Sequence, residues 1–109
     1  MEVPLDTLYA ALSHPIRRGI LEQLQQESRL VHELAGRFDV SAPAISKHLR
    51  TLENAKLIYR KKRGREQHIF INGEVLQPAA SYLQQYQAHW ERQLDALNDY
   101  VKQKERNNE

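Results

Sequence analysis

Two short apolar stripes with a tight break between them constrain the fold of this chain most strongly. The first stripe follows the i, i+3, i+4, i+7 spacing of an amphipathic helix and consists of Val31, Leu34, Ala35 and Phe38. Asp39-Val40 interrupts that helix, Ser41 is a typical N-cap for the next one, and Pro43 suits its first turn. The second stripe consists of Ile45, Leu49 and Leu52. We therefore predict two helices joined by a tight turn, the helix-turn-helix arrangement.

The spacing of apolar residues changes from a helical to a strand period after the second helix. Leu57–Tyr59 leads into the basic run Arg60–Arg63, Gly64 suits a turn, and Gln67–Ile71 has the alternation of a returning strand. These segments predict a β-hairpin with a basic tip. The whole pattern predicts a winged helix-turn-helix, a mostly helical α+β fold with one hairpin as its wing.

A long amphipathic helix is predicted from Glu74 to about Lys102. Its apolar positions recur at spacings of three and four and are Leu76, Ala80, Leu83, Trp90, Leu94, Leu97 and Val101. A stripe of this length needs more partner surface than one small domain offers, so we expect it to pack against a second copy of itself. Residues 1–102 are predicted to form one domain with this helix as its dimerisation element, and 103–109 a polar tail.

The composition narrows the class of protein. There is no cysteine among the 109 residues, which excludes disulfides and thiolate metal sites. No apolar run approaches the ~20 residues that a membrane helix needs, and the N-terminus has no basic segment followed by a long apolar one. We therefore expect a cytoplasmic protein without a membrane partner. No P-loop or nucleophile elbow occurs, so we expect no enzyme activity.

The basic residues are concentrated in one segment although the formal net charge is only +2. Half of the sixteen lysines and arginines lie between Lys47 and Arg65, where Glu53 is the one opposing charge. A solvated surface normally mixes the two signs, so this cluster on a helix-turn-helix and its wing favours double-stranded DNA as the partner.

The second helix of the motif is predicted to enter the major groove. Ala42 and Pro43 allow close approach, while Ser46 and Lys47 offer hydrogen bonds to base edges. Ser41 serves chiefly as the cap, and for His48 two roles stay open, a phosphate contact or packing against the preceding helix. The predicted DNA-binding residues, phosphate contacts of the helix and wing included, are Ser41, Ala42, Pro43, Ser46, Lys47, His48, Arg50, Arg60, Arg63 and Arg65.

The same residues are similar to a known family. The stretches LYAALSHPIRRGILEQL and VHELAGRFDVSAPAISKHLRTLENAKLI, followed by the basic hairpin, resemble the ArsR/SmtB family of bacterial repressors over roughly Leu8 to Ile71. The resemblance implies a homodimer built from the first and last helices that binds an inverted repeat over its own promoter. An inducer would then weaken DNA binding. The apolar stripe of the long helix and the family resemblance together predict a dimer interface. It comprises Leu5, Leu8, Leu83, Trp90, Leu94 and Leu97.

The chain departs from the metal-sensing members of that family. Leu30-Val31-His32-Glu33-Leu34 stands where those members have a pattern like CVCDL, and on the last helix His89 and Glu91 have the wrong spacing for the other known site. The ending WERQLDALNDYV resembles metal-independent members. We therefore expect no metal and no cofactor.

Several alternatives stay open. Tyr86 and Trp90 are assigned to packing at the dimer seam, with an inter-subunit pocket for an unidentified small-molecule inducer as the alternative. A metal-responsive repressor of the same fold, a protein-interaction module and a factor that binds double-stranded RNA or the ribosome are the rival functions.

Overall fold

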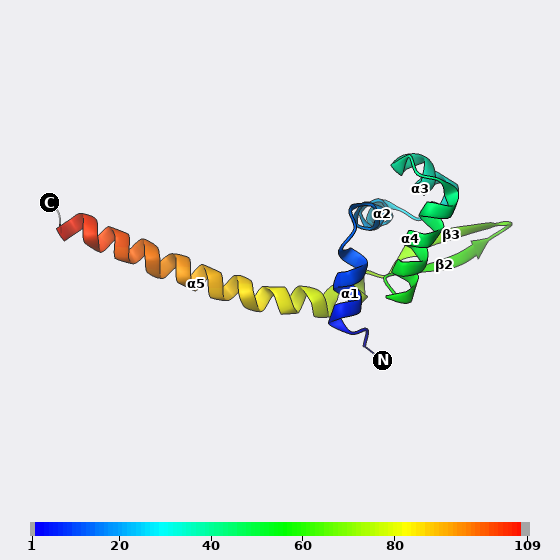
Figure 1. Ribbon diagram of the computed structural model, residues 1–109. Coiled ribbons are helices and arrows are strands. Elements are labelled where there is room, and N and C mark those ends of the chain that lie inside the picture. The colour runs from blue at the N-terminus through cyan, green and yellow to red at the C-terminus, as the bar shows by residue number, and fades with distance from the viewer. Residues whose placement is uncertain (1, 108–109) are drawn as a thin grey trace. The chain divides into compact units, whose positions relative to one another are not determined.

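The computed structural model describes residues 2–107 and contains the predicted succession of helices with one hairpin (Figure 1). The elements are α1 (Leu5–Leu12), α2 (Pro15–Gln26), β1 (Arg29–Leu30), α3 (Val31–Phe38), α4 (Ala42–Asn54), β2 (Ile58–Arg63), β3 (Glu66–Ile71), the 3-10 turn η1 (Gly73–Leu76) and α5 (Gln77–Asn107). The chain divides into two units, residues 1–77 and residues 78–109. The fold is the predicted winged helix-turn-helix.

The core of the first unit is made by the predicted stripes. The large side chains that are fully buried are Leu8, Ile20, Leu34, Ile45, Leu49, Leu52, Leu57 and Ile69. Each such side chain contributes roughly 1.5–3 kcal/mol relative to an exposed position. Gly19 of α2 allows α3 to come close, because a Cβ at this position would lie 2.5 Å from Cε1 of Phe38.

The turn between α3 and α4 has the chemistry that its sequence predicts. Asp39 ends α3 in the left-handed conformation, with φ 51° and ψ 47°, which short polar residues tolerate better than most. Ser41 is the N-cap of α4, and its Oγ accepts a hydrogen bond of 3.2 Å from the Ala44 backbone N–H. The predicted cap is confirmed, and it determines where α4 begins.

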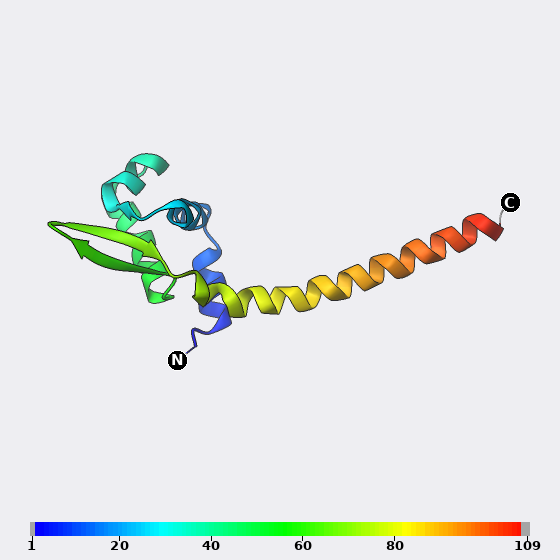
Figure 2. The ribbon, with the colours of Figure 1, turned by 180° about the vertical axis from the view of Figure 1, so that it is seen from behind.

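The wing is a β-hairpin to which a third, very short strand is added. β2 and β3 form the two antiparallel arms of the hairpin (Figure 2). Ile58 lies opposite Ile71, and Gly64 occupies the turn with φ 64°. β1 pairs with the other edge of β3, so the strand order is β1-β3-β2. The sequence did not predict β1, because a strand of two residues has no alternation to detect.

The described part of the second unit is helix α5. Both the first and the last residue of this helix differ from the prediction. The turn η1 precedes it, so the α-helix begins at Gln77 rather than Glu74. It continues to Asn107, past the expected end near Lys102, and residues 103–107 of the predicted polar tail are therefore helical. Lys, Gln, Glu and Arg are good helix formers, and Lys104 and Arg106 in the last turn favour the negative end of the helix dipole. The rest of the predicted tail, 108–109, lies outside the described residues.

Candidate nucleic-acid interface

The outward face of α4 is small and basic, as the sequence predicts. Ser41, Ala42, Pro43, Lys47 and Arg50 are exposed, and Ser46 is half-buried between them and the core side. The opposite face, formed by Ile45, Leu49 and Leu52, is fully buried against the rest of the first unit. α4 therefore exposes short side chains over its N-terminal half and two cations, Lys47 and Arg50, further along. Such a face meets the steric and hydrogen-bonding requirements of the major groove.

The wing carries a second group of cations, in which Arg63 and Arg65 were predicted DNA contacts and Lys61 and Lys62 were not. Arg63 and Arg65 are exposed on either side of Gly64, and Lys61 and Lys62 precede them on β2. The guanidinium of Arg63 lies over the Phe70 ring, 5.3 Å from its centroid. Lys61 and Lys62 belong to the same basic run of the sequence as Arg63. Together with Arg63 and Arg65 they give the outer part of the hairpin four exposed cations.

Arg60 is placed differently from the other basic residues of the wing. Its Nε donates a 2.8 Å hydrogen bond to Oε1 of Glu53, and its Nη2 forms an ion pair with the same oxygen at 2.7 Å. This pair joins the base of β2 to the last turns of α4. Arg60 was predicted to contact a phosphate of DNA, but its positive charge is paired with Glu53.

His48 has partners that the sequence reasoning did not anticipate. Its ring centroid lies 4.3 Å from that of His14, and its Nδ1 lies 3.3 Å from Nη1 of Arg17. These residues belong to the start of α2, not to α3. Burial is the main reason that the pKa of His48 falls below its ordinary value of 6.5, and the nearby His14, Arg17 and Lys47 lower it further.

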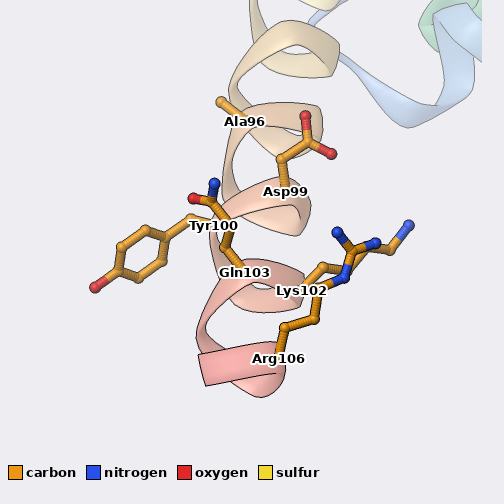
Figure 3. Close-up of a pocket in the computed structure, with 6 residues that line it drawn as sticks. All are labelled: Ala96, Asp99, Tyr100, Lys102, Gln103 and Arg106. Carbon is orange, nitrogen blue, oxygen red and sulfur yellow. The ribbon is translucent and has the colours of Figure 1, made fainter. Parts of the chain in front are cut away.

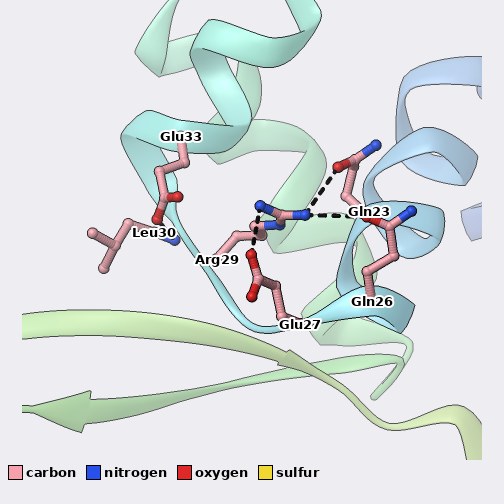
Figure 4. Close-up of polar contacts among 6 residues, drawn as sticks. All are labelled: Gln23, Gln26, Glu27, Arg29, Leu30 and Glu33. Atoms are coloured by element: carbon pink, nitrogen blue, oxygen red, sulfur yellow. Dashed lines mark hydrogen bonds and ion pairs between the residues drawn. The ribbon is translucent and has the colours of Figure 1, made fainter.

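Polar contacts hold Arg29 and the start of the segment that stands in place of the cysteine pattern (Figure 4). Arg29 Nη1 lies 3.0 Å from Glu27 Oε1, while Nη2 donates to the side-chain oxygens of Gln23 and Gln26. Glu33 Oε1 accepts a 2.9 Å hydrogen bond from the Leu30 backbone N–H. The Arg29 contacts fasten β1 to the end of α2, and the Glu33 contact caps the start of α3. Within residues 2–107, no three histidine, aspartate or glutamate side chains gather as metal ligands would.

The surface of α5 has one apolar side. Large apolar or aromatic side chains that are exposed on this helix are Tyr82, Leu83, Tyr86, Trp90, Leu94, Leu97, Tyr100 and Val101. They include four of the residues predicted for the dimer interface, and Trp90 is 64% exposed. Of the other two, Leu5 is half-buried but Leu8 is 0% exposed. Leu8 therefore belongs to the core of the chain and has no surface to offer to a partner.

A shallow hollow of about 530 Å³ lies along the C-terminal half of α5 (Figure 3). It is lined by Ala96, Asp99, Tyr100, Lys102, Gln103 and Arg106. All six come from a single helix, so the hollow is a stretch of helix surface and not a ligand cavity. In the part of the chain that the structure describes, no helix is apolar over enough of its length to cross a membrane.

Comparison with known proteins places this geometry in a family. A family model described as "Bacterial regulatory protein, arsR family" matches residues 14–60, from the N-cap of α2 into β2. The transcriptional repressor SdpR of Bacillus subtilis is 30% identical over 79 residues, which cover 72% of this chain and 88% of that protein.

Two solved structures extend the comparison to the whole fold. An ArsR-like transcriptional regulator from Rhodococcus sp. RHA1 is 35% identical with a TM-score of 0.73, and the match covers 90% of each chain. A homodimeric winged helix-turn-helix DNA-binding domain from Mycobacterium bovis is 26% identical with a TM-score of 0.61, over 80% of this chain and 82% of that one. The chain therefore belongs to the ArsR family, and it is a DNA-binding transcriptional regulator, not an enzyme.

Proposed function

We propose that this regulator represses transcription as a homodimer that binds an inverted-repeat operator, including one at its own promoter. The observation that carries the proposal is the exposed face of α4, where Ala42, Pro43, Ser46 and Lys47 lie opposite a fully buried stripe. Ser46 and Lys47 contact base edges, Ala42 and Pro43 permit close approach, and Ser41 and Arg50 contact phosphates. Repression is steric, because the bound dimer excludes polymerase from the promoter. The regulator acts in the cytoplasm.

The wing supplies affinity that does not depend on sequence. Arg63 and Arg65 at the tip, with Lys61 and Lys62 beside them, lie against the DNA backbone or the adjacent minor groove. Arg60 is left out of this set because Glu53 already neutralises it. His48 is also left out, because its ring is engaged by His14 and Arg17.

The second copy is proposed to pack on the apolar side of α5. At 1.5 Å per residue, the 31 residues of this helix span roughly 46 Å. Along that length Leu83, Trp90, Leu94 and Leu97 are each more than half exposed, which is unusual for large apolar side chains unless a partner covers them. Leu5 of α1, which is half-buried in the first unit, is proposed as a further contact of the dimer. The winged helix-turn-helix domain from Mycobacterium bovis is described as homodimeric, which supports a homodimer here.

A two-fold dimer makes a geometric prediction about its DNA. Its two α4 helices enter successive major grooves, so the half-sites lie about 34 Å, or one helical turn, apart. The metal-responsive alternative would need ligands other than cysteine, because Leu30 and His32 stand at the two cysteine positions of the sensing pattern.

The test is selection of bound sites from random duplex DNA, with the upstream region of the gene as a second substrate. Enrichment of an inverted repeat with that spacing supports the proposal and provides the probe for an inducer screen. Binding that is equal on all duplexes, or stronger on duplex RNA, contradicts it. The Lys47→Ala variant is the control, because it should change which sequences are enriched without abolishing binding.

A further inference from the structure

Two imidazole rings and one guanidinium meet where α1, α2 and α4 join, outside the exposed face of α4. His14 is the N-cap of α2, and its Nδ1 accepts a 3.1 Å hydrogen bond from the Ile16 backbone N–H. The His48 ring of α4 lies against it, with the centroids 4.3 Å apart and the planes 49° apart. Arg17 Nη1 lies 3.3 Å from His48 Nδ1. All three side chains belong to the first unit.

Arg17 binds the end of α1 with the rest of its guanidinium. Its Nε donates to the Ala11 carbonyl at 2.7 Å and its Nη2 to the Ala10 carbonyl at 2.9 Å. Both carbonyls lie at the C-terminal end of α1, where the helix dipole attracts cations, and the Ala10 carbonyl also accepts from the backbone N–H and Oγ of Ser13. One side chain therefore connects the end of α1 to α4.

The chemistry of these groups determines where the proton on His48 can be. A guanidinium has only donors, so the 3.3 Å contact is a hydrogen bond only if His48 Nδ1 is the acceptor. Nδ1 must then carry no proton. A second proton on the ring would place N–H opposite N–H and one positive charge beside another. Protonation thus converts the Arg17–His48 contact from attraction to repulsion.

We propose that Arg17 and His48 are positioning residues that hold α4 in its DNA-binding orientation only while His48 is neutral, so that acid weakens operator binding. The proposal rests on the assignment of α4 as the recognition helix. Neither residue contacts DNA in it. Both act by fixing α4 relative to α1 and α2.

The surroundings of His48 favour its neutral form. The turn before α2 faces it with His14, α2 with Arg17, and α4 itself supplies Lys47. After burial, these three groups lower the pKa of His48. Two carboxylates of α3 and α4 have other partners, since Glu53 binds Arg60 of β2 and Glu33 binds the Leu30 backbone. Among the described residues, the charged or titratable groups that act on His48 are His14, Arg17 and Lys47, and all three oppose its protonation.

The sign of the pH effect separates this inference from the simpler role of a phosphate contact. If His48 touched a phosphate, protonation would add a charge-assisted hydrogen bond and acid would strengthen DNA binding. If Arg17 positions α4 through neutral His48, acid weakens it. The two roles give opposite slopes between about pH 8 and about pH 5.5, where histidine titrates.

The experiment measures the dissociation constant for the enriched duplex across that range by fluorescence anisotropy. We expect the affinity of the wild-type protein to fall by roughly threefold or more towards acid, relative to His48→Gln. Glutamine offers an oxygen that accepts from Arg17 and does not titrate. His32→Gln, at an exposed histidine of α3, is the matched control and should keep the wild-type slope. A wild-type affinity that rises in acid, with a rise lost in His48→Gln, overturns the proposal.

A variant of the neighbouring Arg18 is the matched control for a variant of Arg17. Arg18 also binds the end of α1, with Nη1 2.8 Å from the Leu12 carbonyl, but it is Arg17 that reaches His48. Arg17→Ala should lower operator affinity by roughly tenfold and flatten the pH slope, whereas Arg18→Ala should lower it by less than about threefold and keep the slope. Equal slopes in the two variants would contradict the assignment.

A measurement without DNA keeps the inference separable from the proposed operator function. The folded protein lowers the pKa of His48 below 6.5, so the unfolded chain binds the proton more readily and stability falls as pH drops below about 6.5. The melting temperature should therefore fall less between about pH 8 and about pH 5.5 in His48→Gln than in the wild type. If no operator is enriched, the proposed function fails, and this comparison still decides the role of the contact. Identical pH dependence of the melting temperature in both proteins overturns it.

Discussion

Arg60 and Glu53 form a two-pronged contact in which Nε and Nη2 of the arginine lie 2.8 and 2.7 Å from one carboxylate oxygen. The contact joins the base of the wing to the end of α4, so the hairpin and the recognition helix are fastened at one point. It also neutralises one positive charge in a segment that is otherwise rich in exposed cations. Counting cations in the sequence therefore overestimates the charge that the wing presents.

We predict that Arg60→Ala and Arg63→Ala have different effects on DNA binding. Each phosphate contact that is lost reduces the dependence of log K on log salt by about 0.9. Arg63→Ala should show this reduction, because Arg63 is exposed at the wing tip, while Arg60→Ala should leave the slope nearly unchanged. Titrations at several salt concentrations measure both slopes. If Arg60→Ala also reduced the slope by about 0.9, Arg60 would have to leave Glu53 and contact a phosphate of the DNA.

Lys47 and Arg50 should differ in the kind of affinity that they provide. Lys47→Ala is expected to cost about 1–3 kcal/mol on the enriched operator and little on unrelated DNA, since a base contact is lost. Arg50→Ala should weaken binding to both duplexes equally, because a phosphate contact carries no sequence information. Parallel titrations with the operator and a scrambled duplex make the comparison. Equal losses on both duplexes for Lys47→Ala would exclude Lys47 as a base contact.

Leu94→Glu should convert the dimer into monomers. A charge at the centre of the apolar side of α5 would be buried without a partner, and the operator affinity should fall by roughly a hundredfold or more because two half-sites are no longer bound together. Ala88→Glu is the matched control, since Ala88 is exposed and the helical repeat places it on the side of α5 opposite the apolar residues. Analytical ultracentrifugation reports the assembly. Dimers that persist in Leu94→Glu would move the interface elsewhere.

Gly19→Ala is predicted to destabilise the first unit although alanine is the better helix former. The new Cβ would lie 2.5 Å from Phe38 Cε1, so the ring or the helix must shift, at about 1–3 kcal/mol. This exceeds the gain of about 0.5–1 kcal/mol from removing a helical glycine. Gly36→Ala is the control: nothing lies within 4 Å of its Cβ position, so it should raise stability. Urea unfolding tests both, and Phe38→Leu should partly rescue Gly19→Ala.

The apolar spacings of Val31–Phe38 and Ile45–Leu52, together with the Ser41 cap, are sufficient by themselves to predict the recognition motif. The basic run and Gly64 likewise predict the hairpin. These features succeed because they are local: a helix stripe, a cap and a turn each depend on residues within a few positions of one another. The outward face of α4 follows from the same stripe, since the residues that are not buried must point away from the core.

Contacts between different helices and strands are what only the tertiary structure decided. The sequence places Arg60 in a basic run, yet Glu53 neutralises it, and it places Leu8 on a dimer helix, yet Leu8 is wholly inside the core. His48 was open to two roles, and its partners are His14 and Arg17, more than thirty residues earlier in the chain. The physical reason is the same in each case. Hydrophobic periodicity determines which side of an element is buried, but the charge state and accessibility of a single side chain depend on the groups that packing brings to it from elsewhere in the chain.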